Sequence, residues 1–140
     1  MNLSPHFTLA EMVASPTARR MGFTEQFEPP PHIIAALKEL CLKILEPLRK
    51  EVGPIVVSSG YRCARLNKKV KGAKNSQHLV GEAADIKCVN YKNKAIFLAA
   101  QKLKLPYDQL IWEYGTRQEP DWIHVSLGPR NRKQILYIGV

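Results

Sequence analysis

The sequence predicts an α+β domain with a small, mostly antiparallel sheet. In the first half of the chain, apolar residues recur at helical spacing between His32 and Leu48. In the second half, short runs rich in β-branched residues are separated by turns that contain Gly and Pro. The length of 140 residues, 45% of them hydrophobic, suits a single domain over residues 1–140.

The helical elements follow from apolar periodicity and from capping signals. Thr8 and Glu11 have the spacing of a capping box, which predicts a helix start. We expect four helices: a short one from Glu11, the main amphipathic one from His32, a small one up to about Val70, and a sizeable one over 93–104. Pro47 is expected to kink or break the main helix before Arg49, because proline has no amide hydrogen to donate.

The strands are predicted from short β-branched runs that end at turn residues. We expect them at residues 55–58, 84–88, 110–114, 122–127 and 134–138. Residues 15–31 end in three prolines and are expected to form an extended connection between helices.

Composition excludes several classes of protein. The three cysteines are an odd number without a C-x-x-C spacing, so we expect no disulfide framework. No apolar run is long enough to span a bilayer, and no membrane insertion is expected. The formal charge of +9 points to an anionic partner. The densest basic stretch, residues 62–74, contains no aromatic residue that could stack on bases, so a nucleic-acid-binding module is a minor alternative.

Two separate stretches contain the side chains of a metal site. Residues 76–85 read SQHLVGEAAD, and residues 121–125 read DWIHV. They supply two imidazoles, one carboxylate and a spare acid three residues before the last histidine. Strand alternation turns His124 away from its apolar neighbours, and Gly81 provides a turn that brings His78 towards Asp85. A catalytic zinc site needs this set of three ligands with a further carboxylate nearby.

The two stretches resemble the family of zinc D-alanyl-D-alanine carboxypeptidases and L-alanyl-D-glutamate endopeptidases, which cleave peptidoglycan in bacteria and their phages. The resemblance extends to SSGYR at 58–62, HFTLAEM at 6–12 and LEPLR at 45–49. These segments are similar to the compact, single-domain branch found in many phage genomes. The resemblance implies a hedgehog-like or D-Ala-D-Ala-peptidase-like fold, with helices packed on one side of the sheet.

The resemblance also implies roles for individual residues. The zinc ligands would be His78, Asp85 and His124, and Asp121 would be the general base and acid. Arg62 would polarise the scissile carbonyl or anchor the substrate. Ser76 and Gln77 would be further substrate contacts. Glu119 stands where some members carry another histidine, and it is given no role.

The expected reaction is zinc-dependent hydrolysis of a peptidoglycan stem peptide, with the choice between carboxypeptidase and endopeptidase left open. The alternative is a zinc-containing protein that binds the cell wall without cleaving it. We expect a monomer that is synthesised in the bacterial cytoplasm without a signal peptide. It would act on the wall after release by a phage, or as part of the virion.

Overall fold

The computed structural model describes residues 1–140 and contains a five-stranded sheet in the order β3-β4-β6-β5-β7. The strands are β3 (Ile55–Ser59), β4 (Ala83–Cys88), β5 (Gln109–Glu113), β6 (Trp122–Ser126) and β7 (Gln134–Ile138). All neighbours pair antiparallel except β5 and β7, which are parallel. The predicted α+β class is confirmed, and every predicted strand is found to within one residue at each end.

The rest of the chain is largely helical. The α-helices are α1 (Leu9–Val13), α2 (Pro16–Met21), α3 (Pro31–Leu40), α4 (Glu46–Val52), α5 (Ala64–Lys69) and α6 (Lys94–Lys102). There are two 3-10 turns, η1 (Thr24–Phe27) and η3 (Gln77–Val80), one π-helical turn, η2 (Cys41–Leu45), and an N-terminal pair of short strands, β1 (Asn2–Ser4) and β2 (Phe7–Thr8). The predicted capping box is present, because Thr8 and Glu11 accept each other's backbone N–H groups. No helix combines the length and the apolar character that a membrane crossing requires.

The prediction of an extended connection over residues 15–31 is wrong. The Ser15 hydroxyl accepts a hydrogen bond from the backbone N–H of Ala18, and Pro16 occupies the first turn of α2. Gly22, with φ 71°, ends that helix in the left-handed conformation, and η1 follows. The segment therefore contained a helix start signal at Ser15 and a stop signal at Gly22, seven residues later, which the prolines at its end obscured.

The main helix does not break at Pro47. α3, η2 and α4 follow one another without interruption from Pro31 to Val52, and the π-helical turn lies immediately before the proline. In that turn the backbone N–H of Glu46 donates to the carbonyl of Cys41, five residues earlier. The shifted hydrogen-bond register lets the helix continue past a residue that has no amide hydrogen.

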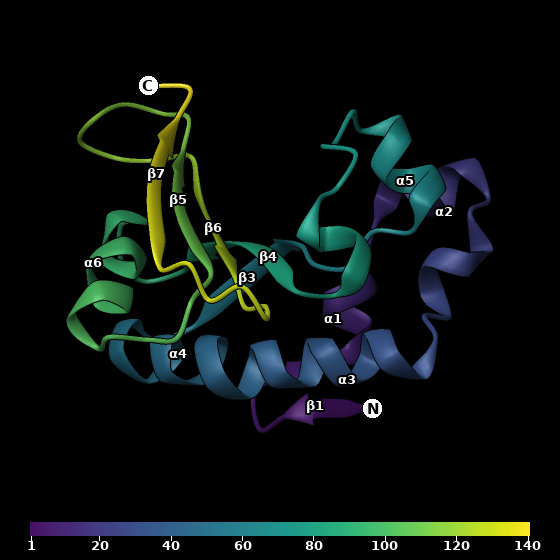
Figure 1. Ribbon diagram of the computed structural model, residues 1–140, viewed down its shortest axis with the longest axis horizontal. Coiled ribbons are helices and arrows are strands. Elements are labelled where there is room, and N and C mark those ends of the chain that lie inside the picture. Colours follow the sequence, from purple (N-terminus) through teal and green to yellow (C-terminus); the bar gives the residue numbers. More distant parts are fainter.

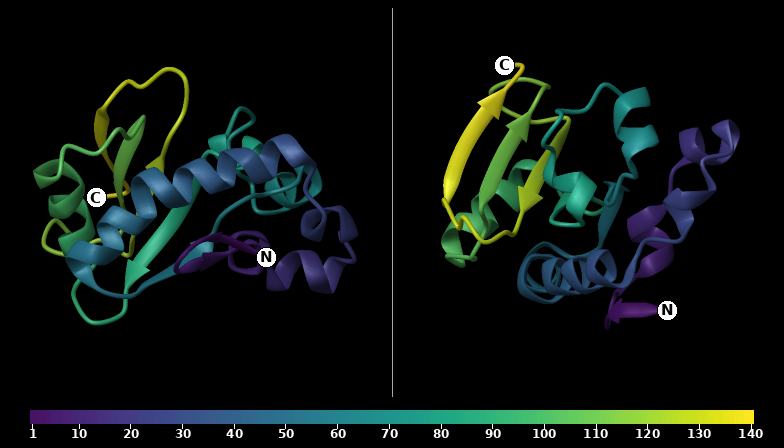
Figure 2. Two further views of the ribbon diagram at one scale, coloured as in Figure 1. Left: turned by 90° about the horizontal axis from the view of Figure 1, so that it is seen from below. Right: turned by 45° about the vertical axis from the view of Figure 1, so that its right-hand side comes forward.

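The two faces of the sheet have different surroundings. One face contributes Ile86, Leu110, Ile123 and Val125 to the hydrophobic core, and α6 packs against its strands. Residues of the opposite parity face the segment that contains α5 and η3. The long helix, formed by α3, η2 and α4, runs beneath both the sheet and this segment (Figure 1 and the right view of Figure 2). The left view of Figure 2, seen from below, shows its length. A cleft of about 680 Å³ lies between the sheet and the segment with α5 and η3, and residues from both line it.

Candidate metal centre

Three elements bring His78, Asp85 and His124 together. His78 lies on η3, and Asp85 and His124 are directly paired on the adjacent antiparallel strands β4 and β6. Gly81 ends η3 with φ 73°, which turns the chain from His78 into β4. All three side chains are buried and line the cleft. The predicted turn at Gly81 between His78 and Asp85 is confirmed.

Each imidazole presents a nitrogen to the Asp85 carboxylate. Nδ1 of His78 lies 2.6 Å from the carbonyl oxygen of Gly60, and its Nε2 lies 3.4 Å from Oδ2 of Asp85. Nδ1 of His124 lies 3.0 Å from Oδ1 of the same carboxylate. A ligating histidine that is oriented by a backbone carbonyl through its other nitrogen is typical of metal centres in proteins.

The donor set fits a divalent metal ion. One ligand atom from each of the three residues lies within 4.8 Å of the others. Donors around a tetrahedral ion with bonds of ~2.1 Å are separated by roughly 3.4 Å, so the observed spacing needs little adjustment. Two imidazoles and one carboxylate form a ligand set suited to catalytic zinc.

The charge of Asp85 is stabilised in this buried position. Burial raises the pKa of its carboxyl group, but hydrogen bonds from His124 and His78 outweigh this effect and lower the pKa below its ordinary value. Arg62 adds a further contact, with Nη2 3.4 Å from Oδ2 of Asp85. Asp85 is therefore ionised and held in place, as a metal ligand has to be.

Glu113 is a second carboxylate at the site, and sequence reasoning missed it. Its Oε1 lies 3.9 Å from Nδ1 of His124, and the residue lines the cleft. Burial raises the pKa of Glu113, and the nearby charge of Asp85 raises it further. Trp122 orients the side chain by donating from Nε1 to Oε2 at 3.1 Å. Glu113 is paired with Trp122, which shares a face with His124, so its side chain reaches the site through the register between β5 and β6.

Asp121 lies outside the cleft lining. Its side chain is exposed, and its backbone N–H donates to the carbonyl of Glu113. It precedes His124 by three residues, and an odd separation along a strand turns two side chains to opposite faces of a sheet. Glu119, which was given no role, accepts the backbone N–H groups of Asn93 and Lys94 at the start of α6.

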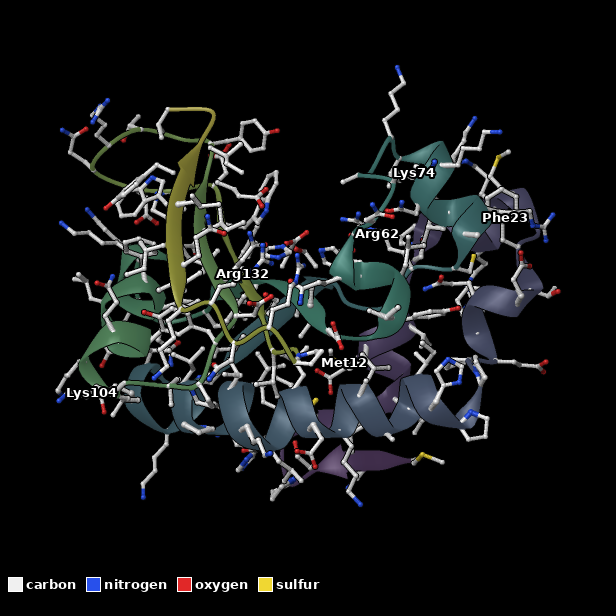
Figure 3. The ribbon with its side chains drawn as sticks, viewed as in Figure 1. Met12, Phe23, Arg62, Lys74, Lys104 and Arg132 are labelled. Atoms are coloured by element: carbon white, nitrogen blue, oxygen red, sulfur yellow. The ribbon has the colours of Figure 1, made fainter.

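The other predicted site residues line the cleft. Arg62 is held by Oγ of Ser59 and Oδ1 of Asn67 as well as by Asp85. Figure 3 shows Arg62 on the α5 side and Arg132 on the sheet side of the central space. Ser76 caps η3 by accepting the backbone N–H of His78.

Gln77 is part of a polar network that continues to the sheet. Its Nε2 donates to Oδ2 of Asp108 at 3.0 Å and to Oε1 of Glu82 at 3.3 Å. These two carboxylates fix the orientation of the amide, and its Oε1 is buried without a hydrogen-bond partner.

The comparisons with known proteins agree with this geometry. A family model described as Peptidase M15 matches residues 5–126, a range that includes the triad and Glu113. A comparison with curated proteins found no match.

Proposed function

The chain belongs to the peptidase M15 family, whose members are zinc-dependent, and we propose that it hydrolyses peptidoglycan stem peptides. The bond would be the terminal D-Ala-D-Ala amide or the L-Ala-D-Glu amide within the stem. The observation that carries the proposal is the buried triad of His78, Asp85 and His124 on the floor of an open cleft, with the carboxylate of Glu113 beside it.

His78, Asp85 and His124 would hold the zinc ion. When bound, the ion would supply Lewis acidity, which polarises an amide carbonyl and brings the pKa of water down towards ~7. Arg62 helps to hold Asp85 in place, because three of its N–H groups donate to Asp85, Asn67 and Ser59. Its remaining N–H donors are available to the scissile carbonyl or to a substrate carboxylate, the role expected from the sequence.

Glu113 is the better supported general base. It would accept a proton from the attacking water while the hydroxide oxygen bonds to the carbonyl carbon. As the carbon–nitrogen bond breaks, it would return that proton to the leaving amine. The position of Glu113 next to His124 favours this role, whereas the exposed side chain of Asp121 gives no such support. Ser76 and Gln77 belong to the cleft wall and are proposed to contact the peptide.

A pair of variants separates the two candidate bases. Glu113→Gln keeps the shape and the Trp122 contact but removes the proton acceptor, so we expect turnover to fall by about 10²- to 10⁴-fold with zinc retained. Asp121→Asn is the matched control and should keep nearly full turnover. Initial rates on stem peptides, with zinc content measured by atomic absorption, give both quantities. Loss of activity in Asp121→Asn alone would restore the assignment made from sequence.

The metal requirement is tested independently of the base. His124→Ala should lose zinc, activity and some stability, because metal binding contributes to folding free energy. Mass spectrometry of the products, with and without a chelator, identifies the bond that is cleaved. A protein that retains stoichiometric zinc and sediments with purified peptidoglycan, but releases no new amino groups, would instead be a zinc-containing wall-binding protein.

The setting of the reaction is also a proposal. A single peptidase domain with a formal charge of +9 suits an anionic wall polymer as partner. We propose a lytic, endolysin-type role in a phage, with action on the cell wall and the chain working as a monomer. Sedimentation of the purified protein would test whether it is a monomer, and lysis of permeabilised bacteria would test the lytic role.

A further inference from the structure

Three arginines line the cleft, and two of them already have partners. Arg62 is held by Asp85, Asn67 and Ser59. Arg132 donates from Nε and Nη2 to the carboxylate of Asp108 at 2.9 and 2.8 Å. Arg130 makes no hydrogen bond and no ion pair within the chain. It is therefore the one cleft-lining guanidinium whose charge is not matched by a protein carboxylate.

The loop that carries Arg130 is fixed at its base. Asp108 is fully buried and also accepts the backbone N–H of Arg132 at 2.8 Å. The backbone N–H of Gln134 donates to the carbonyl of Asp108 at 2.9 Å. Asn131 and Lys133, on either side of Arg132, have left-handed φ values of 42° and 50°. The hydrogen bonds from Arg132 and Gln134 to Asp108 therefore hold the backbone next to Arg130.

The same segment contributes three residues to the sheet-side wall of the cleft. Arg130, Arg132 and Ile138 all come from residues 127–140, which follow the part of the chain matched by the family model. The opposite wall presents the short polar side chains of Asn75 and Ser76. A peptide lying between the walls would pass the triad and come within reach of a single unpaired cation.

We propose that Arg130 binds a carboxylate of the substrate and so determines which peptides this cleft accepts. The inference rests on the proposed function and names the charge that the cleft selects. A guanidinium fork pairs with a carboxylate through two parallel hydrogen bonds, which gives both affinity and orientation. The carboxylate has two sources in a stem peptide: the terminal carboxylate of D-alanine, or the free carboxylate of D-glutamate.

Peptide pairs that differ only in that charge test the proposal. We compare the stem peptide with one analogue amidated at the C-terminus and another amidated at the D-glutamate carboxylate. Arg130→Gln should raise KM for the unmodified peptide by about 10- to 100-fold, with kcat little changed, since it removes a charge-assisted contact made in the ground state. For the analogue that lacks the recognised carboxylate, the wild-type protein and Arg130→Gln should have the same KM.

The wild-type protein and Arg130→Gln should have equal KM for only one of the two amidated analogues. The carboxylate that this analogue lacks is the one that Arg130 binds. Lys133→Gln is the matched control, because it removes one positive charge from the same loop at a residue outside the cleft lining, and its KM values should equal those of the wild-type protein. The proposal is overturned if Arg130→Gln leaves KM unchanged, or if it raises KM equally for all three peptides.

Failure of the proposed function remains distinguishable from failure of this inference. If the zinc-loaded wild-type protein cleaves none of the peptides, the peptidase proposal fails. Calorimetric titration of Glu113→Gln and of the double variant Glu113→Gln, Arg130→Gln with the same peptides does not need turnover. The titration should still show that the peptide with the free carboxylate binds, and that Arg130→Gln lowers this affinity by the same 10- to 100-fold expected for KM. Equal affinity of Glu113→Gln for the unmodified peptide and for both amidated analogues would contradict the assignment of Arg130 to a substrate carboxylate.

Discussion

Gly81 ends the turn that carries His78 and leads it into β4. It has φ 73°, and a Cβ atom built there would lie 2.9 Å from the carbonyl oxygen of Ile33 and 3.3 Å from Cγ of Leu37. Alanine would therefore be strained in its own backbone and would also press against the long helix. We expect Gly81→Ala to lower the free energy of unfolding by about 2–4 kcal/mol, measured by urea denaturation, and to weaken zinc binding.

Gly22 provides the matched control for this prediction. It has nearly the same φ, 71°, but no atom lies within 4 Å of the Cβ that alanine would add. Gly22→Ala should cost only the backbone strain, about 1 kcal/mol, with unchanged zinc affinity. Equal losses in the two variants would mean that contact with the long helix contributes nothing at Gly81.

The clamp between β5 and the loop before β7 is expected to depend on pH. Hydrogen bonds from Arg132 lower the pKa of the buried Asp108 carboxyl group from 3.8 to about 2. Because the folded-state pKa lies below the unfolded-state value, this carboxylate stabilises the fold above about pH 4. That contribution is lost as the pH falls towards 2.

The stability of Asp108→Asn relative to the wild-type protein measures this effect. The advantage of the wild-type protein should be about 1 kcal/mol smaller at pH 3 than at pH 6 in urea denaturation. A chelator is present at both pH values, so that protonation of the metal ligands does not contribute. Arg132→Gln, which removes the cause of the shift, should show a similar loss of pH dependence. A wild-type advantage that is the same at both pH values would contradict the assignment.

Elements could be predicted from the sequence where a local pattern determines them. The five strands follow from β-branched runs between turn residues, and α1 follows from its capping box. Pro47 predicted a kink or a break, and the π-helical turn that lets the helix continue past it was not predicted. α2 could have been found from Ser15 and Gly22, but the proline run at 29–31 was given more weight.

The site could be predicted to the extent that its residues lie in two continuous stretches. His78, Asp85 and His124 were expected from their spacing, from strand phase and from the resemblance to a zinc peptidase family, and the structure brings them together. Glu113 was missed because its place depends on the pairing of β5 with β6, which no local spacing reveals. Arg130 was missed for a related reason, since its loop reaches the cleft only when β7 pairs parallel to β5.

At the scale of the whole molecule, the triad connects parts of the chain that are distant in sequence, so zinc binding and folding should be coupled. His78 comes from the α5–η3 side of the cleft, while Asp85 and His124 come from the sheet. A metal ion that binds only the folded protein stabilises it by about 2.7 kcal/mol when its free concentration is 100 times its dissociation constant. For a chain of this length that corresponds to a rise of roughly 10 °C in melting temperature.

Thermal unfolding of the metal-free protein at increasing zinc concentrations measures this coupling. The melting temperature should rise with zinc in the wild-type protein and stay constant in His78→Ala, which keeps the rest of the chain but lacks one ligand. Magnesium should have little effect on either, because it prefers an all-oxygen set of six ligands. A zinc-dependent rise in the melting temperature of His78→Ala equal to that of the wild-type protein would place the stabilising ion elsewhere. It would contradict the prediction that zinc stabilises the fold by binding at the triad.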